Sequence, residues 1–188
     1  MFNKRNLTAY YFINEINEST ISIISEFKNI SLIYLNKNNT LLNLPDLTNI
    51  KKFCNKNNIK FYVTDNIRLA IKIGANGIYL TKDYNKMSHN FNYKKDFEIL
   101  GSVHNQLEYY KKISQKCKKV FLSPIFYNKK YSTNTILGTI KFRLISRDWK
   151  YKAIPLSGIN RDNINKVYLA NKKEIAFKGW KQKNPPNN

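Results

Sequence analysis

Ile99-Leu100-Gly101-Ser102-Val103-His104 is the first of three apolar runs in the second half of the chain that end in a small, polar, serine-containing cluster. The other two are residues 120–126 (VFLSPIF) and residues 153–160 (AIPLSGIN). The buried strands of a parallel barrel need bulky side chains along their length, whereas small or polar residues at their carboxyl ends leave room for a ligand. The pattern therefore predicts a parallel barrel with a pocket at one end.

Strand-like and helix-like patterns alternate along the whole chain, which is typical of βα units around a parallel sheet. Strands are expected at residues 9–13, 31–35, 60–63, 77–80, 98–102, 119–122, 153–156 and 174–177. Helices are expected at residues 19–27, from Pro45 onward, and at 66–73, 105–116, 142–149 and 163–169. Eight strands predict a compact (β/α)8 TIM barrel over residues 1–180, well below the roughly 250 residues typical of this fold.

Several connections and the end of the chain have their own signals. Residues 82–96 are too long and polar for a simple turn, and the loop at 127–138 is long enough to serve as a lid. Asn105 has the side chain of a helix N-cap, and Glu108 three residues later completes a capping box. The last helix is short or missing, so Trp180 is expected to cover the side or bottom of the barrel there, and residues 181–188 to form a flexible tail.

The composition of the 188 residues, of which 42% are hydrophobic, is sufficient for the core of one domain. The formal net charge of +21 would ordinarily indicate a polyanionic partner. However, the charge is scattered and mostly lysine, and Lys, Asn, Ile, Tyr and Phe are abundant together, which an AT-rich codon bias produces. We therefore expect small-molecule ligands rather than nucleic acid, and the sequence leaves open whether the chain forms homo-oligomers.

The cysteines and the start of the chain predict a cytoplasmic protein that does not bind a membrane. Cys54 and Cys117 lie far apart without metal-ligand spacing, and are expected to be half-buried thiols in a reducing compartment. The first residues are not followed by the apolar segment of a signal peptide, and no run approaches the ~18 apolar residues of a membrane span.

Two strand ends carry residues with a chemical interpretation of their own. Asp65 stands between an expected strand and an expected helix, where a carboxylate either caps the helix or binds a cation above the barrel mouth; the residues alone favour the cap. Ser157 and Gly158 end another strand, and such a turn suits close approach of the backbone to an anion.

Five segments in this order resemble the thiamine phosphate synthase and TenI superfamily: residues 61–80, 102–104, 123–126, 156–160 and 175–179. The resemblance extends from about Lys60 to Trp180, roughly two thirds of the chain. It implies a (β/α)8 barrel active in thiamine biosynthesis. The synthase joins hydroxymethylpyrimidine pyrophosphate to thiazole phosphate and expels pyrophosphate with the help of Mg²⁺, whereas TenI proteins isomerise the thiazole carboxylate phosphate with a histidine as acid and base.

The same resemblance implies roles for particular residues. Asp65 would bind magnesium together with Asp83, which is displaced by one position from the family's second carboxylate. His104 would be the acid and base, and Lys129 and Lys130 would neutralise the leaving pyrophosphate. Substrate contacts are implied at strand ends and in the loops that follow them, at Tyr34, Asn36, Asn38, Thr64, Ser102, Asn128, Ser157, Gly158, Lys178 and Gly179.

Two strand ends depart from the family pattern. The synthase has Gln-x-Arg-x-Lys after its second strand, where this chain has Tyr34-Leu35-Asn36-Lys37-Asn38. The family's His-x-Gly-Gln-x-Asp after the fourth strand is Tyr79-Leu80-Thr81-Lys82-Asp83-Tyr84 here. The loss of two cations and a carboxylate would cost several kcal/mol of transition-state stabilisation if nothing compensates.

Three functions are compatible with these observations. We favour the synthase reaction, because Asp65 is retained. A TenI-type thiazole tautomerase would explain why the pyrophosphate grip has decayed while His104 and the thiazole-phosphate loops remain. The third is a protein without catalytic activity that binds thiazole or thiamine phosphates, or a basic barrel recruited to nucleic acid.

Overall fold

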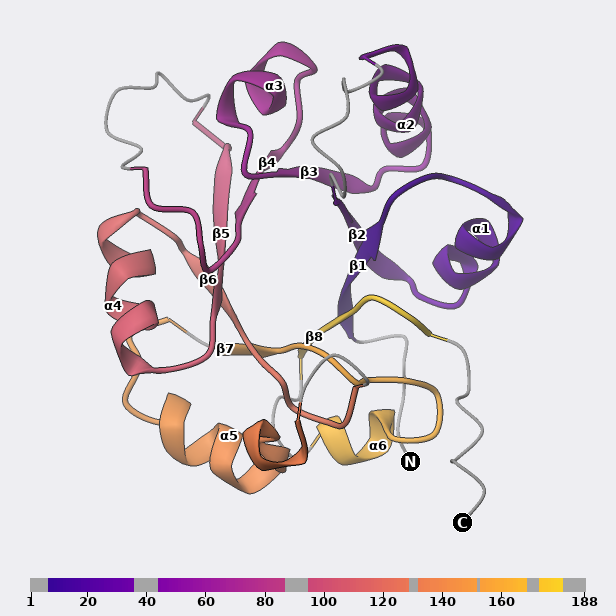
Figure 1. Cartoon of the computed structure of the whole chain (residues 1–188). Coiled ribbons are helices and arrows are strands. Elements are labelled where there is room, and N and C mark those ends of the chain that lie inside the picture. The colour runs from indigo at the N-terminus through magenta and orange to yellow at the C-terminus, as the bar shows by residue number, and fades with distance from the viewer. Residues whose placement is uncertain are drawn as a thin grey trace.

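The computed structural model describes residues 7–35, 44–86, 95–128, 132–151, 153–168 and 173–180, in which helices separate consecutive strands except between β4 and β5, where the described residues contain no helix (Figure 1). The strands are β1 (Thr8–Ile13), β2 (Asn29–Tyr34), β3 (Lys60–Thr64), β4 (Gly77–Leu80), β5 (Glu98–Val103), β6 (Lys119–Leu122), β7 (Ala153–Pro155) and β8 (Glu174–Phe177). The helices are α1 (Glu18–Ser25), α2 (Leu44–Lys56), α3 (Ile67–Lys72), α4 (Gln106–Ser114), the 3-10 helix η2 (Thr133–Thr135), α5 (Gly138–Ser146) and α6 (Ile164–Val167).

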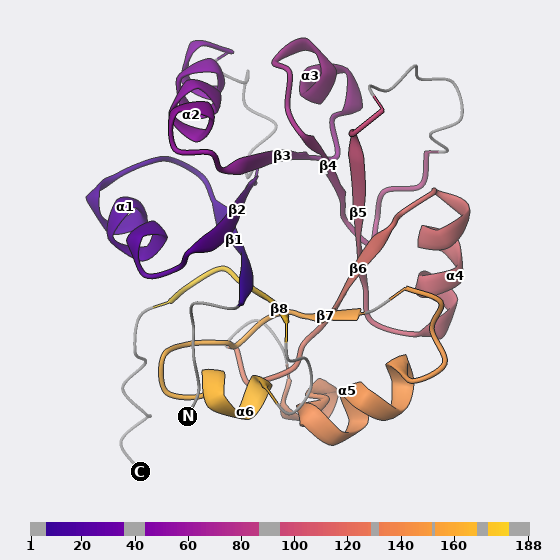
Figure 2. The ribbon, with the colours of Figure 1, turned by 180° about the vertical axis from the view of Figure 1, so that it is seen from behind.

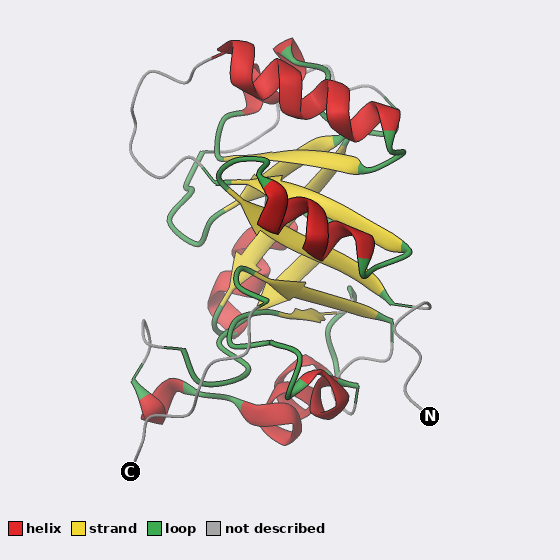
Figure 3. Ribbon diagram, turned by 90° about the vertical axis from the view of Figure 1, so that its right-hand side faces the viewer, coloured by secondary structure: helices red, strands yellow, loops and turns green. Residues whose placement is uncertain are grey.

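All eight strands are parallel and follow the order β7-β6-β5-β4-β3-β2-β1-β8 (Figure 2). The two outermost strands meet through a single bridge between Leu156 and Ala176. The sheet is therefore a nearly closed barrel, with the helices outside the strands (Figure 3). The predicted compact (β/α)8 fold is confirmed.

Aromatic side chains fill the interior of the barrel. Tyr10 and Phe12 of β1 pack there with Tyr62, Tyr79 and Phe121, while the alternate residues of the strands face the helices. The rings of Phe12 and Tyr79 meet nearly edge to face with centroids 5.0 Å apart, and those of Tyr10 and Phe121 do so at 5.1 Å. The interior is thus a packed core, and only its carboxyl end is left for a ligand.

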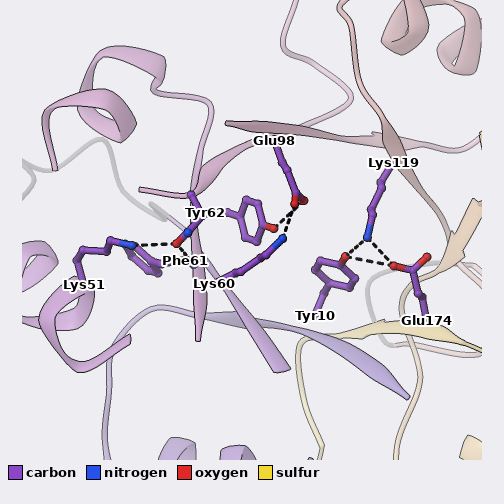
Figure 4. A network of polar contacts seen from close by, with 9 residues as sticks. Tyr10, Lys51, Lys60, Phe61, Tyr62, Glu98, Lys119 and Glu174 are labelled. Atoms are coloured by element: carbon purple, nitrogen blue, oxygen red, sulfur yellow. Dashed lines mark hydrogen bonds and ion pairs between the residues drawn. The ribbon is translucent and has the colours of Figure 1, made fainter. Parts of the chain in front are cut away.

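The amino-terminal end of the barrel is closed by paired polar groups from different strands (Figure 4). Lys119 of β6 donates hydrogen bonds to Glu174 of β8 and to the hydroxyl of Tyr10, both at 2.7 Å. The hydroxyl of Tyr62 donates to Glu98, the first residue of β5, at 2.9 Å. These contacts connect β1, β3, β5, β6 and β8 beneath the aromatic core.

The largest difference from the expected elements lies after β6, where α5 begins four residues before the helix predicted at residues 142–149. Gly138 has a φ of +63° and would ordinarily indicate a turn. Its N–H donates to the carbonyl of Ile125, and the N–H of Leu137 donates to that of Pro124, so the start of α5 is held against the end of β6. Trp149 lies beyond the helix and stacks on Tyr109 with a centroid distance of 4.1 Å.

Trp180 covers the side of the barrel beside β8, as expected where a last helix would lie. Its ring contacts Phe27 and Phe177, and its Nε1 donates to Glu26 at 2.8 Å, next to the end of α1. The tail predicted at residues 181–188 lies outside the described residues.

The two cysteines are fully buried rather than half-buried, because both lie in the layer between strands and helices. Burial raises the pKa of the Cys54 and Cys117 thiols to about 12. Both are free thiols, and their burial makes them poor nucleophiles. No helix in the described segments is long and apolar enough to cross a membrane.

Candidate functional site

A cavity of about 570 Å³ opens at the carboxyl ends of the strands. Its wall comes from β1 and α1, from Leu35 after β2, and from the ends of β4 and β5 and the segments that follow β4 to β8, which share one rim because all strands are parallel. Phe12 and Tyr79, two of the interior aromatic residues, also line the cavity, so that its inner surface can receive a flat ring. Tyr11, Tyr127 and Trp180 add further aromatic surface.

The turn after β7 brings the backbone close to the cavity. Ser157 and Gly158 have left-handed φ angles of +80° and +73°. A Cβ atom at position 158 would lie 2.4 Å from the carbonyl oxygen of Phe126, so only glycine fits. Asn128 Nδ2 donates to Ser157 Oγ at 3.4 Å, and Lys178 beyond β8 lines the same cavity. A tight turn of small residues beside a lysine suits an anion such as phosphate.

His104 follows β5 and is held between two other side chains. Its Nδ1 lies 3.0 Å from Glu108 Oε2, and its backbone N–H donates to the same oxygen at 2.8 Å. On the other side, His104 Nε2 lies 3.4 Å from Ser123 Oγ. The cavity is lined by His104, Ser123 and Ser102 but not by Glu108. The Glu108 carboxylate therefore contacts the His104 ring from outside the cavity.

The loop after β4 is anchored by α4. Lys112 is fully buried, and its Nζ donates to the carbonyl of Thr81 at 2.5 Å and to Gln115 Oε1 at 3.0 Å. Gln115 in turn donates to two carbonyls of the same loop. Burial lowers the pKa of Lys112. The anchored loop presents Lys82 and Asp83 to the cavity.

Asp65 links the end of β3 to this same loop. Its two carboxylate oxygens accept hydrogen bonds from the N–H of Thr81 at 2.8 Å and from the Thr81 hydroxyl at 2.5 Å. Burial raises the pKa of Asp65, although these hydrogen bonds and Lys112 act against the shift. The cap of α3 is Asn66, whose side chain accepts from the N–H of Leu69 at 3.0 Å, so the helix-capping alternative for Asp65 is wrong.

The sheet order places two lysines on opposite walls of the cavity. β4 and β8 are four strands apart in either direction around the barrel. Lys82 follows the first of them and Lys178 the second, and both line the cavity. The site therefore has a cation at each side of an aromatic inner surface.

Comparison with known proteins identifies the family to which this barrel belongs. Residues 31–178 match the family described as thiamine monophosphate synthase. The chain belongs to this thiamine monophosphate synthase/TenI family. The resemblance inferred from the sequence motifs is thereby confirmed.

Individual relatives of the family are distant. The thiamine-phosphate synthase of Prochlorococcus marinus (strain SARG) is 25% identical over 134 residues, which are 71% of this chain and 39% of that protein. That of Pelagibacter ubique (strain HTCC1062) is 26% identical over 193 aligned positions, with 94% and 91% covered. This chain thus spans about two fifths of the length of the Prochlorococcus relative.

Among solved structures, a thiamine phosphate pyrophosphorylase from Pyrococcus furiosus has a TM-score of 0.64 and 15% identity, with 93% of this chain and 87% of that chain covered. At this identity the structural likeness shows a shared barrel fold and does not extend to the reaction.

The barrel brings together eight of the residues that the family resemblance implied. They line the cavity and are Asp83, Ser102, His104, Asn128, Ser157, Gly158, Lys178 and Gly179. Tyr34, Thr64 and Asp65 do not line it; Thr64 Oγ1 instead donates to the carbonyl of Tyr34 at 2.6 Å and connects β3 to β2. Asn36, Asn38, Lys129 and Lys130 lie outside the described residues.

Sequence reasoning missed several contributors to this family member's site. The sequence pattern assigns Glu108 to the capping box alone, although its spacing four residues after His104 at a helix start is a signal for a second contact. In the sequence, Lys82 stands out only as part of the segment after the fourth strand that differs from the family pattern. Lys112 carries no signal, because a lysine on an amphipathic helix is usually solvated and nothing in the pattern indicates its burial.

Magnesium is the cofactor that the family resemblance implies. Within the described part of the chain, no three His, Cys, Asp or Glu side chains gather into a metal site. Asp83 lies on the cavity wall and interacts electrostatically with Asp65, both of whose oxygens already accept hydrogen bonds from Thr81. Mg²⁺ is commonly held by one or two carboxylates together with substrate phosphates and water. Of this pair only Asp83 lines the cavity, so Asp83 is the carboxylate placed to hold an ion together with a phosphorylated ligand.

Proposed function

We propose that this family member makes thiamine phosphate by joining hydroxymethylpyrimidine pyrophosphate to thiazole phosphate. The observation that carries the proposal is the pair of lysines on opposite walls of one cavity, Lys82 after β4 and Lys178 after β8. Two substrates that each bring a phosphate group need two cationic places. The volume of about 570 Å³ lies in the range of small-molecule sites.

In the proposed reaction, the thiazole nitrogen attacks the methylene carbon of the pyrimidine. A C–N bond forms while the C–O bond to pyrophosphate breaks, and the leaving oxygen keeps the electron pair. Charge therefore accumulates on the leaving group, where a fixed cation has its largest effect. Lys82 is the described cation for that role, because its loop is anchored by the buried Lys112. We assign Lys129 and Lys130, from the loop after β6, to the same charge.

The remaining wall residues would hold the thiazole half. Its phosphate would bind at Ser157 and Gly158 beside Lys178, with Gly179 on the same wall of the cavity. Asn128, which donates to Ser157, would position that turn. When bound, magnesium would neutralise phosphate charge near the Asp83 carboxylate.

The direct test is incubation of micromolar protein with both phosphorylated substrates and magnesium, followed by chromatographic detection of thiamine phosphate. Lys82→Met and Lys178→Met should each lower kcat/KM roughly tenfold to a hundredfold, because each removes a charged contact to phosphate. Lys166→Met is the matched control, since Lys166 is an exposed lysine of α6 outside the cavity. Absence of thiamine phosphate with the unaltered chain would overturn the proposal.

A second candidate function is favoured by the surroundings of His104. A TenI-type tautomerase needs a histidine that takes a proton from the thiazole ring and returns it to another ring atom, with no other reactant consumed. His104 lines the cavity and is supported by Glu108. His104→Ala should abolish isomerisation of the thiazole carboxylate phosphate while calorimetry still detects its binding. Full activity of this variant would exclude the role.

A further inference from the structure

We infer that Glu108 is a positioning residue that fixes the tautomer of His104, so that Nε2 is the proton-accepting nitrogen and faces Ser123 and the cavity. The inference deepens the proposed function. It rests on that function only where it assigns the proton transfer to a particular reaction. The tautomer itself is a property of the chain without ligand.

The carboxylate of Glu108 lies at Nδ1 of the His104 ring. Glu108 Oε2 accepts from the backbone N–H of His104 at 2.8 Å and lies 3.0 Å from its ring Nδ1, so one oxygen fixes both the main chain and the ring. The second oxygen accepts from Asn105 Nδ2 at 3.3 Å. An ionised carboxylate can only accept hydrogen bonds, so the contact at 3.0 Å requires the proton on Nδ1.

The position of the hydrogen on Nδ1 decides which ring nitrogen of His104 can accept a proton. In neutral imidazole one nitrogen carries a hydrogen and the other is an acceptor. With the hydrogen on Nδ1, the acceptor is Nε2, which lies 3.4 Å from Ser123 Oγ. Ser123 is buried, and both Ser123 and His104 line the cavity. The contact is long, as catalytic hydrogen bonds often are before substrate binds.

The side chains of His104 and Glu108 are both mostly buried. The side chains of His104 and Glu108 are 23% and 27% exposed, so each is largely removed from water while the ring still reaches the cavity. Asn105 caps α4 by accepting from the N–H of Glu108 at 2.9 Å, which holds the first turn of the helix under the ring. The start of α4 thus both begins a helix and orients His104.

The experiment is a long-range ¹H–¹⁵N correlation spectrum of the histidine rings in the full-length chain at pH 8. The other histidine, His89, is identified by the His89→Gln variant. We expect His104 to show a protonated Nδ1 and an unprotonated Nε2. Glu108→Ala should lose this pattern and lower kcat of any proton transfer on the thiazole ring at least tenfold with little change in KM. Glu108→Gln, which keeps a carbonyl acceptor, should restore the pattern.

Asn17→Ala is the matched control, because it removes the asparagine that caps α1 by accepting from the N–H of Thr20 and leaves every contact of Glu108 in place. It should keep the ring pattern of the unaltered chain. A protonated Nε2 in the unaltered chain, or an unchanged pattern in Glu108→Ala, would overturn the inference. If Glu108→Ala does not fold, loss of the pattern in Glu108→Gln would overturn it. The expected spectra without turnover would support the tautomer assignment and refute only the tautomerase reaction.

Discussion

The two ends of the barrel place their charged side chains differently. At the amino-terminal end Lys119 pairs with Glu174 from another strand, at 2.7 Å and beneath the aromatic core. At the carboxyl end Lys82, Asp83 and Lys178 line a cavity. In a barrel of this kind the first end contributes stability and the second binds ligands. Substitutions at the two ends should therefore separate folding from binding.

At the turn after β7, a single substitution should affect both folding and ligand binding. It is the substitution with the largest expected effect. Gly158→Ala places a Cβ 2.4 Å from the Phe126 carbonyl at a φ of +73°, so the backbone must move. We expect a loss of roughly 3 kcal/mol in unfolding free energy, together with loss of thiazole phosphate binding. Urea unfolding and calorimetry measure the two effects.

Gly74→Ala is the matched control for that substitution. Gly74 has a similar φ of +65°, but no atom lies within 4 Å of the added Cβ. Only the conformational cost remains, about 1 kcal/mol, and binding should be unchanged. Equal destabilisation by the two substitutions would show that the backbone around Gly158 relaxes easily, and that the turn is not a built anion site.

At the amino-terminal end, Lys119→Met should cost stability alone. It removes the ammonium group that pairs with the Glu174 carboxylate, at a position where the two side chains are 35% and 19% exposed. We expect roughly 2 kcal/mol of destabilisation in urea unfolding and unchanged ligand affinity. The exposed neighbour Lys118 provides the control Lys118→Met, which should change neither. A loss of affinity in Lys119→Met would show that the two ends are coupled.

The arrangement of the strands could be predicted from sequence because each strand carries a strong local signal. The strands at 77–80, 119–122 and 174–177 have the bounds expected, since each is a short buried run between polar or glycine-containing segments. The strand expected to reach Leu156 ends at Pro155, because Leu156 makes only a single bridge to β8. The position of that bridge depends on closure of the barrel, which no local pattern contains.

The candidate site could be predicted only in part, for a related reason. Residues at or just beyond the strand ends, such as Ser102, His104 and Ser157, could be placed at the cavity because strand ends share one rim. The partner of Asp65 could not be predicted, because Thr81 lies 16 residues away on another strand end. The burial of Lys112 could not be predicted either, since it depends on two carbonyls of the loop after β4 and on Gln115, the residue that caps the end of α4.

Lys112→Met tests whether the carboxyl end also contains purely structural residues. The methionine fills a similar space, but the Thr81 carbonyl and Gln115 lose a buried donor. We expect a loss of roughly 1–2 kcal/mol in unfolding free energy and a higher KM, because the loop with Lys82 and Asp83 loosens. The exposed Lys141 of α5 gives the control Lys141→Met. Unchanged KM would show that the loop does not need this anchor.

The smallest expected effect is a pH dependence of stability that belongs to the amino-terminal end. Burial alone would raise the pKa of Glu98, but hydrogen bonds from Lys60 and Tyr62 outweigh it and lower the pKa below its usual value. The stability contributed by ionised Glu98 is therefore present above its unfolded pKa, near ~4.3, and is lost as the pH falls through the lower folded value.

Glu98→Gln removes this titration. Its unfolding free energy should lie below that of the unaltered chain by about 1 kcal/mol or less at pH 7, and the difference should shrink between about pH 5 and pH 3. Lys60→Met should reduce the same pH dependence, because Lys60 donates one of the two hydrogen bonds. A difference that stays constant across this range would assign the contribution of Glu98 to packing. The two ends would then differ in where their charged side chains lie, and the charge of Glu98 would not be among the contributions that stabilise the fold.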